Sequence, residues 1–278
     1  MERTRVGAVE YLNTAPLIEG LARVEGLELV PMVPAAIGPA LAAGEIDLGL
    51  VSVIDVARSP EPLTILPVGM IGCDGPTLTV RVSSRVPVDR IEAVHADTES
   101  HTSVALCRII FERAHGRRVS IEPLDAAGVS PGELPDTVLR IGDKVVTRPL
   151  AGEGFGYELD LGEAWHAWTG LPMVYAAWAC RSQALDGEDR LRLQMAAALL
   201  DRQRRHNAGR LDWIASRWAA ARGWPLDIAR AYLSTMLRYD LDARARAGLA
   251  RFLEESAGLG LVDSPAVALW DLAAMAAR

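Results

Sequence analysis

Short apolar runs alternate with segments of helical spacing through the first third of the chain. Strands are predicted at residues 5–10, 27–33 and 47–51. The helices that follow them are predicted at 16–22, from near Pro39 to residue 43, and at 54–58. Strands and helices that alternate at this interval predict a parallel sheet with right-handed crossovers.

Longer apolar strands then lead the chain into a second α/β unit and back. The outgoing strands are predicted at 63–68 and 77–83, and the returning strand at 171–179. Between them the pattern predicts a helix at 104–115 and strands at 91–96, 119–123 and 138–142. The remainder is helical in spacing, with helices predicted at 191–207, 211–222, 226–237, 243–257 and from Pro265 onward.

This order of elements predicts an α/β fold of two lobes with a ligand cleft between them. The first lobe is discontinuous, with residues 1–84 and 179–278, and the second is expected at 85–178. The C-terminal helices are expected to fold back on the first lobe. No internal repeat is evident.

Composition narrows the range of functions. The chain has 278 residues, 50% of them hydrophobic, and a net charge of −7 without a basic block, so nucleic acid is not expected as a partner. The sequence contains neither a membrane-length apolar run nor a signal-like start, which predicts a protein of the cytoplasm without membrane contact. Cys73, Cys107 and Cys180 have no CxxC spacing, and the histidines form no ligand motif, so neither a metal site nor a disulfide framework is expected.

Polar residues follow the first predicted strand at the point where its helix should begin. Tyr11, Asn13 and Thr14 stand here, and Pro16 suits the first helical turn. Asn13 or Thr14 is a natural N-cap, but the carboxyl end of a strand in an open α/β sheet is also where ligands bind. A capped helix and a binding turn are both consistent with this segment.

Three other polar clusters lie at predicted strand ends. Ser52 opens a short helix, and Ser100, Thr102 and Ser103 crowd the start of the helix at 104–115. Hydroxyls beside unpaired N–H groups suit a carboxylate or phosphate, although a redundant N-cap has the same appearance. Asp143 is expected either to cap the next turn or to reach the cleft.

Two acids farther along are interpreted as structural. Asp160 and Glu163 stand at the start of an amphipathic turn that carries Trp165. Paired carboxylates can perform acid–base chemistry, but helix capping is the more common role and is favoured here.

Together these segments resemble the chorismate dehydratases of the futalosine route to menaquinone. The matching pieces occur in family order: Val9–Thr14, Asp47–Ser52 with Ala57 and Arg58, Ser100–Leu106, Ile141–Asp143, Asp160–Glu163 with Trp165, and Thr169–Ala176. The resemblance implies a type II periplasmic-binding-protein fold used as a cytoplasmic enzyme. It implies that water is eliminated from chorismate to give 3-[(1-carboxyvinyl)oxy]benzoate, without a metal or organic cofactor.

The resemblance also implies site residues. Asn13 is expected to act in catalysis, by holding the departing hydroxyl or the enolpyruvyl arm. The remaining residues are expected to bind the dianionic substrate: Tyr11, Thr14, Ser52, Thr77, Thr79, Ser100, Thr102, Ser103 and Asp143. The family carries a serine-bearing strand where this chain has residues 75–84, so Thr77 or Thr79 is expected to replace that hydroxyl. No protein base is evident, and the substrate's own enolpyruvyl carboxylate is expected to take the proton.

Two other functions fit the same fold. One is a non-catalytic protein that binds small carboxylates, which would be expected to carry an export signal. The other is the naphthoate-forming enzyme of the same pathway, which typically begins with a Ser-Pro-Cys-Pro-Asn-Asp-Thr-like turn and uses a histidine in the second lobe. This chain has Tyr-Leu-Asn-Thr at that point. A ligand-sensing regulatory domain is disfavoured because no DNA-binding module is evident, and the oligomeric state is left open.

Overall fold

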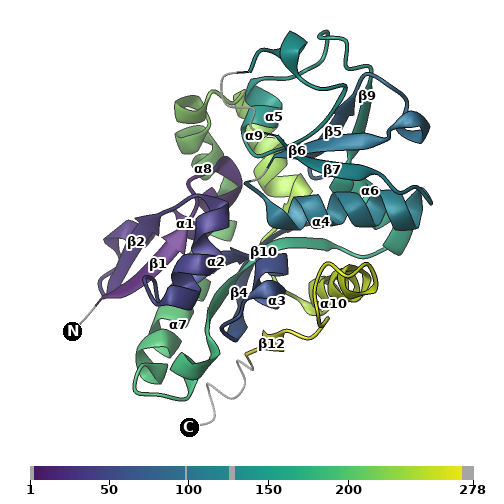
Figure 1. The fold of residues 1–278 in the computed structure, drawn as a ribbon. Coiled ribbons are helices and arrows are strands. Elements are labelled where there is room, and N and C mark those ends of the chain that lie inside the picture. The colour runs from purple at the N-terminus through teal and green to yellow at the C-terminus, as the bar shows by residue number, and fades with distance from the viewer. Residues whose placement is uncertain (1–2, 98, 125–128, 271–278) are drawn as a thin grey trace.

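The computed structural model describes residues 3–97, 99–124 and 129–270, which form two lobes built on separate sheets (Figure 1). The first sheet holds β1 (Thr4–Ala8), β2 (Leu27–Pro31), β3 (Leu48–Ser52), β4 (Leu63–Cys73), β10 (Met173–Arg181), β11 (Leu237–Arg238) and β12 (Ala268–Leu269). The second sheet holds β5 (Val80–Ser84), β6 (Ala93–Asp97), β7 (Ser120–Leu124), β8 (Thr137–Ile141) and β9 (Tyr157–Asp160).

Helices cover both sheets. They are α1 (Ala15–Ile18), α2 (Pro34–Ala43), α3 (Val53–Arg58), α4 (His101–Ile109), α5 (Lys144–Thr147), α6 (Leu161–Thr169), α7 (Arg190–Ala208), α8 (Leu211–Trp218), α9 (Leu226–Ala231) and α10 (Ala243–Gly258). Single π-helical turns extend α4 over Ile110–Ala114 and α9 over Tyr232–Met236. Short 3₁₀ turns occur at Leu12–Thr14, Leu21–Arg23, Val88–Arg90, Pro131–Glu133, Ser182–Leu185 and Ala220–Arg222. No helix of the described residues has the length and apolar character needed to cross a membrane.

Parallel and antiparallel pairings are mixed in both sheets. The first sheet has the order β11-β4-β10-β3-β1-β2, in which β1 is parallel to β2 and β3 whereas β10 is antiparallel to β3 and β4. The second has the order β7-β6-β8-β5-β9, in which β6 is parallel to both of its neighbours and β5 is antiparallel to both of its own. In both lobes the carboxyl ends of the parallel strands carry the polar clusters identified from the sequence, as open α/β sheets require of a ligand site.

The long strands β4 and β10 and the helix α10 connect the two lobes. β4 and β10 pair along most of their length, with all of β4 buried. α10 packs against β10, α3 and α4, and the Phe252 ring of α10 meets the Trp165 ring of α6 edge to face at 6.3 Å. Gly248 permits this docking, since a Cβ there would lie 2.0 Å from the Pro172 carbonyl oxygen. One apolar core therefore extends from the first lobe into the second.

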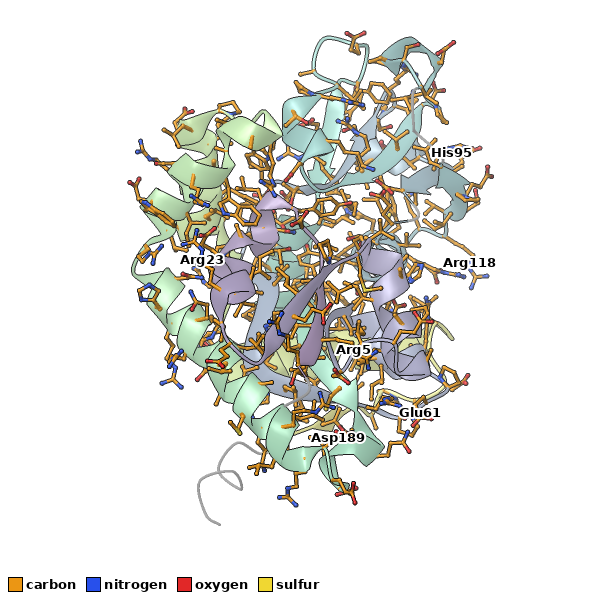
Figure 2. The ribbon with its side chains drawn as sticks, turned by 90° about the vertical axis from the view of Figure 1, so that its left-hand side faces the viewer. Arg5, Arg23, Glu61, His95, Arg118 and Asp189 are labelled. Carbon is orange, nitrogen blue, oxygen red and sulfur yellow. The ribbon has the colours of Figure 1, made fainter. Side chains whose placement is uncertain are left out.

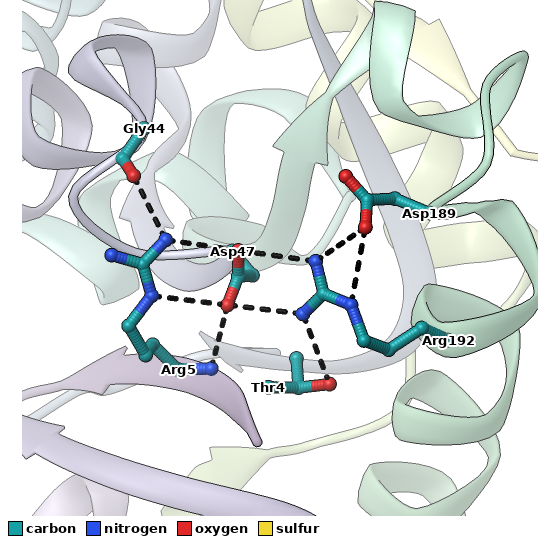
Figure 3. Close-up of polar contacts among 6 residues, drawn as sticks. All are labelled: Thr4, Arg5, Gly44, Asp47, Asp189 and Arg192. Carbon is teal, nitrogen blue, oxygen red and sulfur yellow. Dashed lines mark hydrogen bonds and ion pairs between the residues drawn. The ribbon is translucent and has the colours of Figure 1, made fainter. Parts of the chain in front are cut away.

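A charged network fixes one edge of the first lobe (Figure 3). Asp47, just before β3, accepts the Arg5 backbone N–H at 2.8 Å and pairs with the guanidinium groups of Arg5 and Arg192 at 3.1 and 3.2 Å. Burial alone would raise the pKa of Asp47, but the hydrogen bonds from Arg5 and Arg192 outweigh it and hold that pKa below its usual value. The network joins β1, the loop before β3 and α7, which are far apart in the sequence.

Replacing Asp47 with Asn is expected to lower the free energy of unfolding by about 2–3 kcal/mol at pH 7, because both guanidinium groups lose a shared, largely buried carboxylate. A carboxyl with a lowered folded-state pKa contributes stability above its unfolded pKa and loses it as the pH falls through the folded pKa. The difference between the two proteins should therefore shrink in strong acid. Urea unfolding at pH 7 and at pH 3 measures it; an equal difference at both pH values would contradict this account.

The structure corrects several predicted boundaries. The helix predicted at 16–22 is shorter, because Gly20 takes a left-handed conformation with φ of 90° and ends it. The helix predicted from Pro39 begins at Pro34, with Pro39 inside it. The described part of the segment after Pro265 is not helical: Ala268–Leu269 forms β12 beside β4, and residues 271–278 lie outside the described residues.

The two sheets divide the chain at points close to the predicted lobe boundaries but not identical with them. β5 belongs to the second sheet, so a division by sheets falls before Val80 rather than after residue 84. β10 belongs to the first sheet, so the return falls before Met173 rather than after residue 178. β5 follows β4 after a short connection, and β10 begins shortly after α6, so the sequence pattern does not mark which sheet each strand joins.

Candidate active site

A cavity lies where the two lobes meet. Its empty volume is about 670 Å³, a figure that includes space open to solvent. The walls are largely apolar, with Val9, Leu50, Ile71, Val80 and Ile141 among them. The polar side chains of the lining are Tyr11, Asn13, Ser52, Thr77, Thr79, Ser100, Ser103, Tyr175 and Tyr232. Among the described residues of the lining there is no carboxylate, histidine, lysine or arginine.

The Tyr11–Thr14 turn supplies the first of these side chains. Leu12–Thr14 forms a 3₁₀ turn that leads into α1 and places Tyr11 and Asn13 on the cavity wall. Thr14 is fully buried, and its hydroxyl donates to Oδ1 of Asn13 at 3.0 Å. Thr14 occupies the N-cap position of α1 but makes no capping hydrogen bond, so its predicted role as a side-chain cap is wrong. It does not line the cavity, and it holds Asn13 instead.

Replacing Thr14 with Val is expected to lower turnover about tenfold while KM changes little. Val keeps the branched shape but cannot hold Oδ1, so the amide loses the contact that fixes its orientation on the cavity wall. Thr14→Ser, which keeps the hydroxyl, is the matched control and should recover most of kcat. Steady-state kinetics of the three proteins measures this, and equal kcat values for Val and wild type would exclude the positioning role.

Ser52 and Thr102 bridge the lobes beside the cavity. The two hydroxyl oxygens lie 2.6 Å apart, and Ser52 Oγ also accepts the Thr102 backbone N–H at 3.2 Å. Thr102 Oγ1 accepts the Ile54 N–H at 3.4 Å as well. Ser52 lines the cavity, whereas Thr102 lies outside its lining and is engaged in joining α3 to α4.

The N-terminus of α4 presents the other predicted hydroxyls. The helix begins at His101, three residues before the predicted start, and Ser100 is its N-cap, accepting the Ser103 N–H at 3.3 Å. The Ser100 and Ser103 hydroxyl oxygens are 2.8 Å apart, and both residues line the cavity. Capping and cavity lining are therefore combined in the same side chains.

Further contacts hold the lobes together around the cavity. Tyr11 donates its hydroxyl to Oε2 of Glu99 at 3.0 Å, and the Leu12 N–H donates to Oδ1 of Asp143 at 3.3 Å. Asp143 does not line the cavity, and its side chain does not cap α5. Burial raises the pKa of Asp143. It serves as an acceptor for the Asn13 turn.

His101 is the histidine nearest the polar cluster of α4, but it faces away from the cavity lining. Its Nδ1 lies 2.8 Å from Oδ1 of Asp55, across the lobe junction. That hydrogen bond raises the pKa of His101. The histidine is thus engaged in an inter-lobe ion pair.

Thr77 and Thr79 both line the cavity from the segment that precedes β5, not from a strand as predicted. Asp160 organises this segment, because its carboxylate accepts the backbone N–H groups of Thr77 at 3.0 Å and Leu78 at 2.7 Å. The same carboxylate caps α6 through Gly162 and Glu163, which confirms the predicted cap. Leu78 takes a left-handed conformation with φ of 63°, so the two threonines on either side of it reach the cavity from an irregular turn.

Tyr175 and Tyr232 were not predicted as site residues. Tyr175 lines the cavity from β10, and Tyr232 arrives from the C-terminal helices with its hydroxyl 2.6 Å from that of Thr79. No local pattern marks either residue, since tyrosines among apolar neighbours are common in ordinary cores. Burial raises the pKa of both tyrosines, and burial together with Glu99 raises the pKa of Tyr11, so all three keep their protons.

Two α/β lobes joined by paired strands, with a ligand cavity at their junction, define a protein of the periplasmic-binding-protein type. Solved structures agree. A crystal structure of a protein from Archaeoglobus fulgidus matches with a TM-score of 0.71 at 17% identity, covering 94% of this chain and 98% of that one. The periplasmic aliphatic sulphonate binding protein of Escherichia coli matches with a TM-score of 0.64 at 16% identity, covering 95% and 90%. The predicted fold class is therefore confirmed.

Within this fold the chain belongs to the menaquinone biosynthesis family, whose model matches residues 4–257. It is 30% identical over 274 residues to the chorismate dehydratase of Thermus thermophilus, covering 94% of this chain and 96% of that protein. The family predicted from the sequence is confirmed.

Proposed function

We propose that this protein is a chorismate dehydratase, a lyase that eliminates water from chorismate to give 3-[(1-carboxyvinyl)oxy]benzoate for menaquinone biosynthesis. The observation that carries the proposal is a cavity at the lobe junction, lined by Asn13 and uncharged donors, in a member of this family. The Thermus relative, matched over nearly its full length, bears that name.

The reaction needs one proton and one hydroxide to leave neighbouring ring carbons. The proton departs from the carbon that bears the enolpyruvyl ether, and its electron pair spreads through the adjacent double bond into the ring carboxylate. The pair then returns to form the new ring double bond as the neighbouring hydroxyl leaves, and the ring becomes aromatic. Donors that hold the ring carboxylate stabilise the charge that develops on it.

The lining suits this anion without a cationic side chain. Ser52 lies at the end of β3, and Ser100 and Ser103 surround the N-terminus of α4, where the helix dipole favours negative charge. Ser52 also accepts the Thr102 N–H in the first turn of α4, so these hydroxyls gather at one helix terminus that suits a carboxylate of the substrate. Asn13, with its oxygen held by Thr14, offers an amide N–H to the departing hydroxyl.

The substrate's enolpyruvyl carboxylate is the proposed base. The tyrosines of the lining keep their protons, and Asp143 lies outside the lining as an acceptor for Leu12. A carboxylate within the same molecule gains a large effective concentration over an external base when the pose is fixed. Chorismate esterified at this carboxylate should bind but remain unconverted; its conversion would show that the protein supplies the base.

The activity is tested by incubating the purified protein with chorismate and detecting the benzoate product by mass spectrometry. Binding of chorismate without conversion would favour a non-catalytic binding protein. Conversion of cyclic dehypoxanthine futalosine instead would assign the chain to the naphthoate-forming step. The predicted cytoplasmic location, the lack of a cofactor and the lack of nucleic-acid and membrane partners are proposed with this function.

A further inference from the structure

The chain contains one lysine among 29 basic residues; the other 28 are arginine. This residue, Lys144, begins α5 two positions after Gly142, which lines the cavity together with Ile141. A chain that uses arginine at every other basic position has an ammonium only here. Ammonium is a compact point charge with rotatable donors, whereas guanidinium is a planar fork.

Lys144 meets two carboxylates of the second lobe. Its Nζ forms an ion pair with Oδ2 of Asp97 and lies 3.4 Å from Oε2 of Glu99. The Asp97 side chain is 6% exposed, and its other oxygen accepts the Glu99 N–H at 3.0 Å. Lys144 is therefore the cation that compensates a buried acid and its half-exposed neighbour.

The same Glu99 oxygen accepts the hydroxyl of Tyr11, which lines the cavity from the first lobe. The Tyr11 ring also lies against Gly142, whose φ of 70° brings the backbone close to it: a Cβ built on Gly142 would be 3.5 Å from the ring. Lys144 is thus connected through Glu99 to one wall of the cavity. Its own side chain does not line the cavity, so it acts through its neighbours.

We propose that Lys144 is a positioning residue, which fixes Glu99 and Tyr11 and cancels the negative charge that would otherwise oppose entry of a dianion. The inference rests on the proposed function, because chorismate is the dianion it names. Without Lys144, Asp97 keeps the electrostatic attraction of Arg140, but Asp97 and Glu99 both lose their ion pair beside a cavity whose described lining has no cation of its own. Carboxylates without an ion-pair partner near the cavity repel a dianionic substrate, and salt weakens this repulsion.

The test measures KM and kcat for chorismate in Lys144→Met at low and at moderate salt. KM should rise roughly tenfold at low salt and less at moderate salt, while kcat changes by less than about threefold. The double variant Glu99→Gln with Lys144→Met removes one of the stranded acids and should recover most of the affinity. Lys144→Arg keeps the charge but not the compact geometry, and its KM should fall between wild type and Lys144→Met.

Arg118→Met is the matched control, since it removes one positive charge from an 82% exposed side chain at the outer edge of the same lobe (Figure 2). Its KM and salt dependence should equal those of wild type. If wild type converts chorismate and Lys144→Met has the same KM and salt dependence, the inference is wrong and the proposed function stands. If the double variant is as weak as Lys144→Met, charge compensation is excluded. If wild type does not convert chorismate, the proposed function is wrong, and the inference is then also wrong about its substrate.

Discussion

Replacing Asn13 with Leu is expected to lower the turnover of chorismate by about 10³-fold while the protein remains folded. Asn13 lines the cavity, and Thr14 occupies its amide oxygen, which leaves the amide nitrogen available to a ligand. Removing one preorganised donor to a developing charge typically costs a factor of this size. The fold should lose little, because the change breaks a single side-chain hydrogen bond, and the melting temperature should fall by no more than about 4 °C.

Asn13→Asp is the matched variant, since it keeps the acceptor for Thr14 and the size of the side chain but removes the donor. It should melt like wild type and be as inactive as Asn13→Leu, because it also places a negative charge beside a dianion. Turnover of chorismate and thermal unfolding of the three proteins measure these effects. Retained activity in either variant, with or without a large loss of stability, would contradict a catalytic role for Asn13. The turn would then serve only as the start of a helix.

Replacing Asp160 with Ala is expected to lower the free energy of unfolding by about 3–4 kcal/mol and to disorganise the site with it. The carboxylate accepts four backbone N–H groups, two from the turn before β5 and two from the first turn of α6. Burying these donors without an acceptor is costly, and the loss of an N-cap adds to it. Because Thr77 and Thr79 reach the cavity from that turn, KM should rise as well.

Asp160→Asn should fall between Ala and wild type, since its amide keeps one of the two acceptor oxygens. Glu163→Ala, which removes a neighbouring carboxylate but not the Glu163 N–H, should cost less than about 1 kcal/mol. Urea unfolding and steady-state kinetics of the four proteins provide the comparison. An Asp160→Ala protein of wild-type stability and wild-type KM would contradict this role.

The sequence predicted those parts of the site that depend on local chemistry. Asn13, Ser52 and Ser100 lie at strand ends or helix starts, where both capping and binding were open, and the family resemblance favoured the cleft that they line. Thr102 and Asp143 have the same local signature but are engaged by partners in the other lobe. Spacing along the chain does not reveal which of two adjacent hydroxyls a distant residue will bind.

Parts of the site that depend on tertiary structure were not predictable. Tyr232 is separated from its partner Thr79 by more than half of the chain, and its segment carries only the apolar spacing of a helix. The turn that presents Thr77 and Thr79 was predicted as strand because threonine and valine favour strands. Asp160 overrides that preference by binding the backbone of the turn. These hydrogen bonds join residues about 80 positions apart, and local strand propensity does not include such contacts.

The docking of α10 has a consequence for how the chain folds. Phe252 covers Trp165 of the second lobe, and the Gly248 backbone packs against the carbonyl of Pro172. Both contacts are made by α10, so they can form only after this helix near the end of the chain has been synthesised. On the ribosome the second lobe will have emerged long before α10 does, and until then it exposes an apolar surface. Folding should therefore be completed only after synthesis of α10, with both lobes gaining their final stability in one late step.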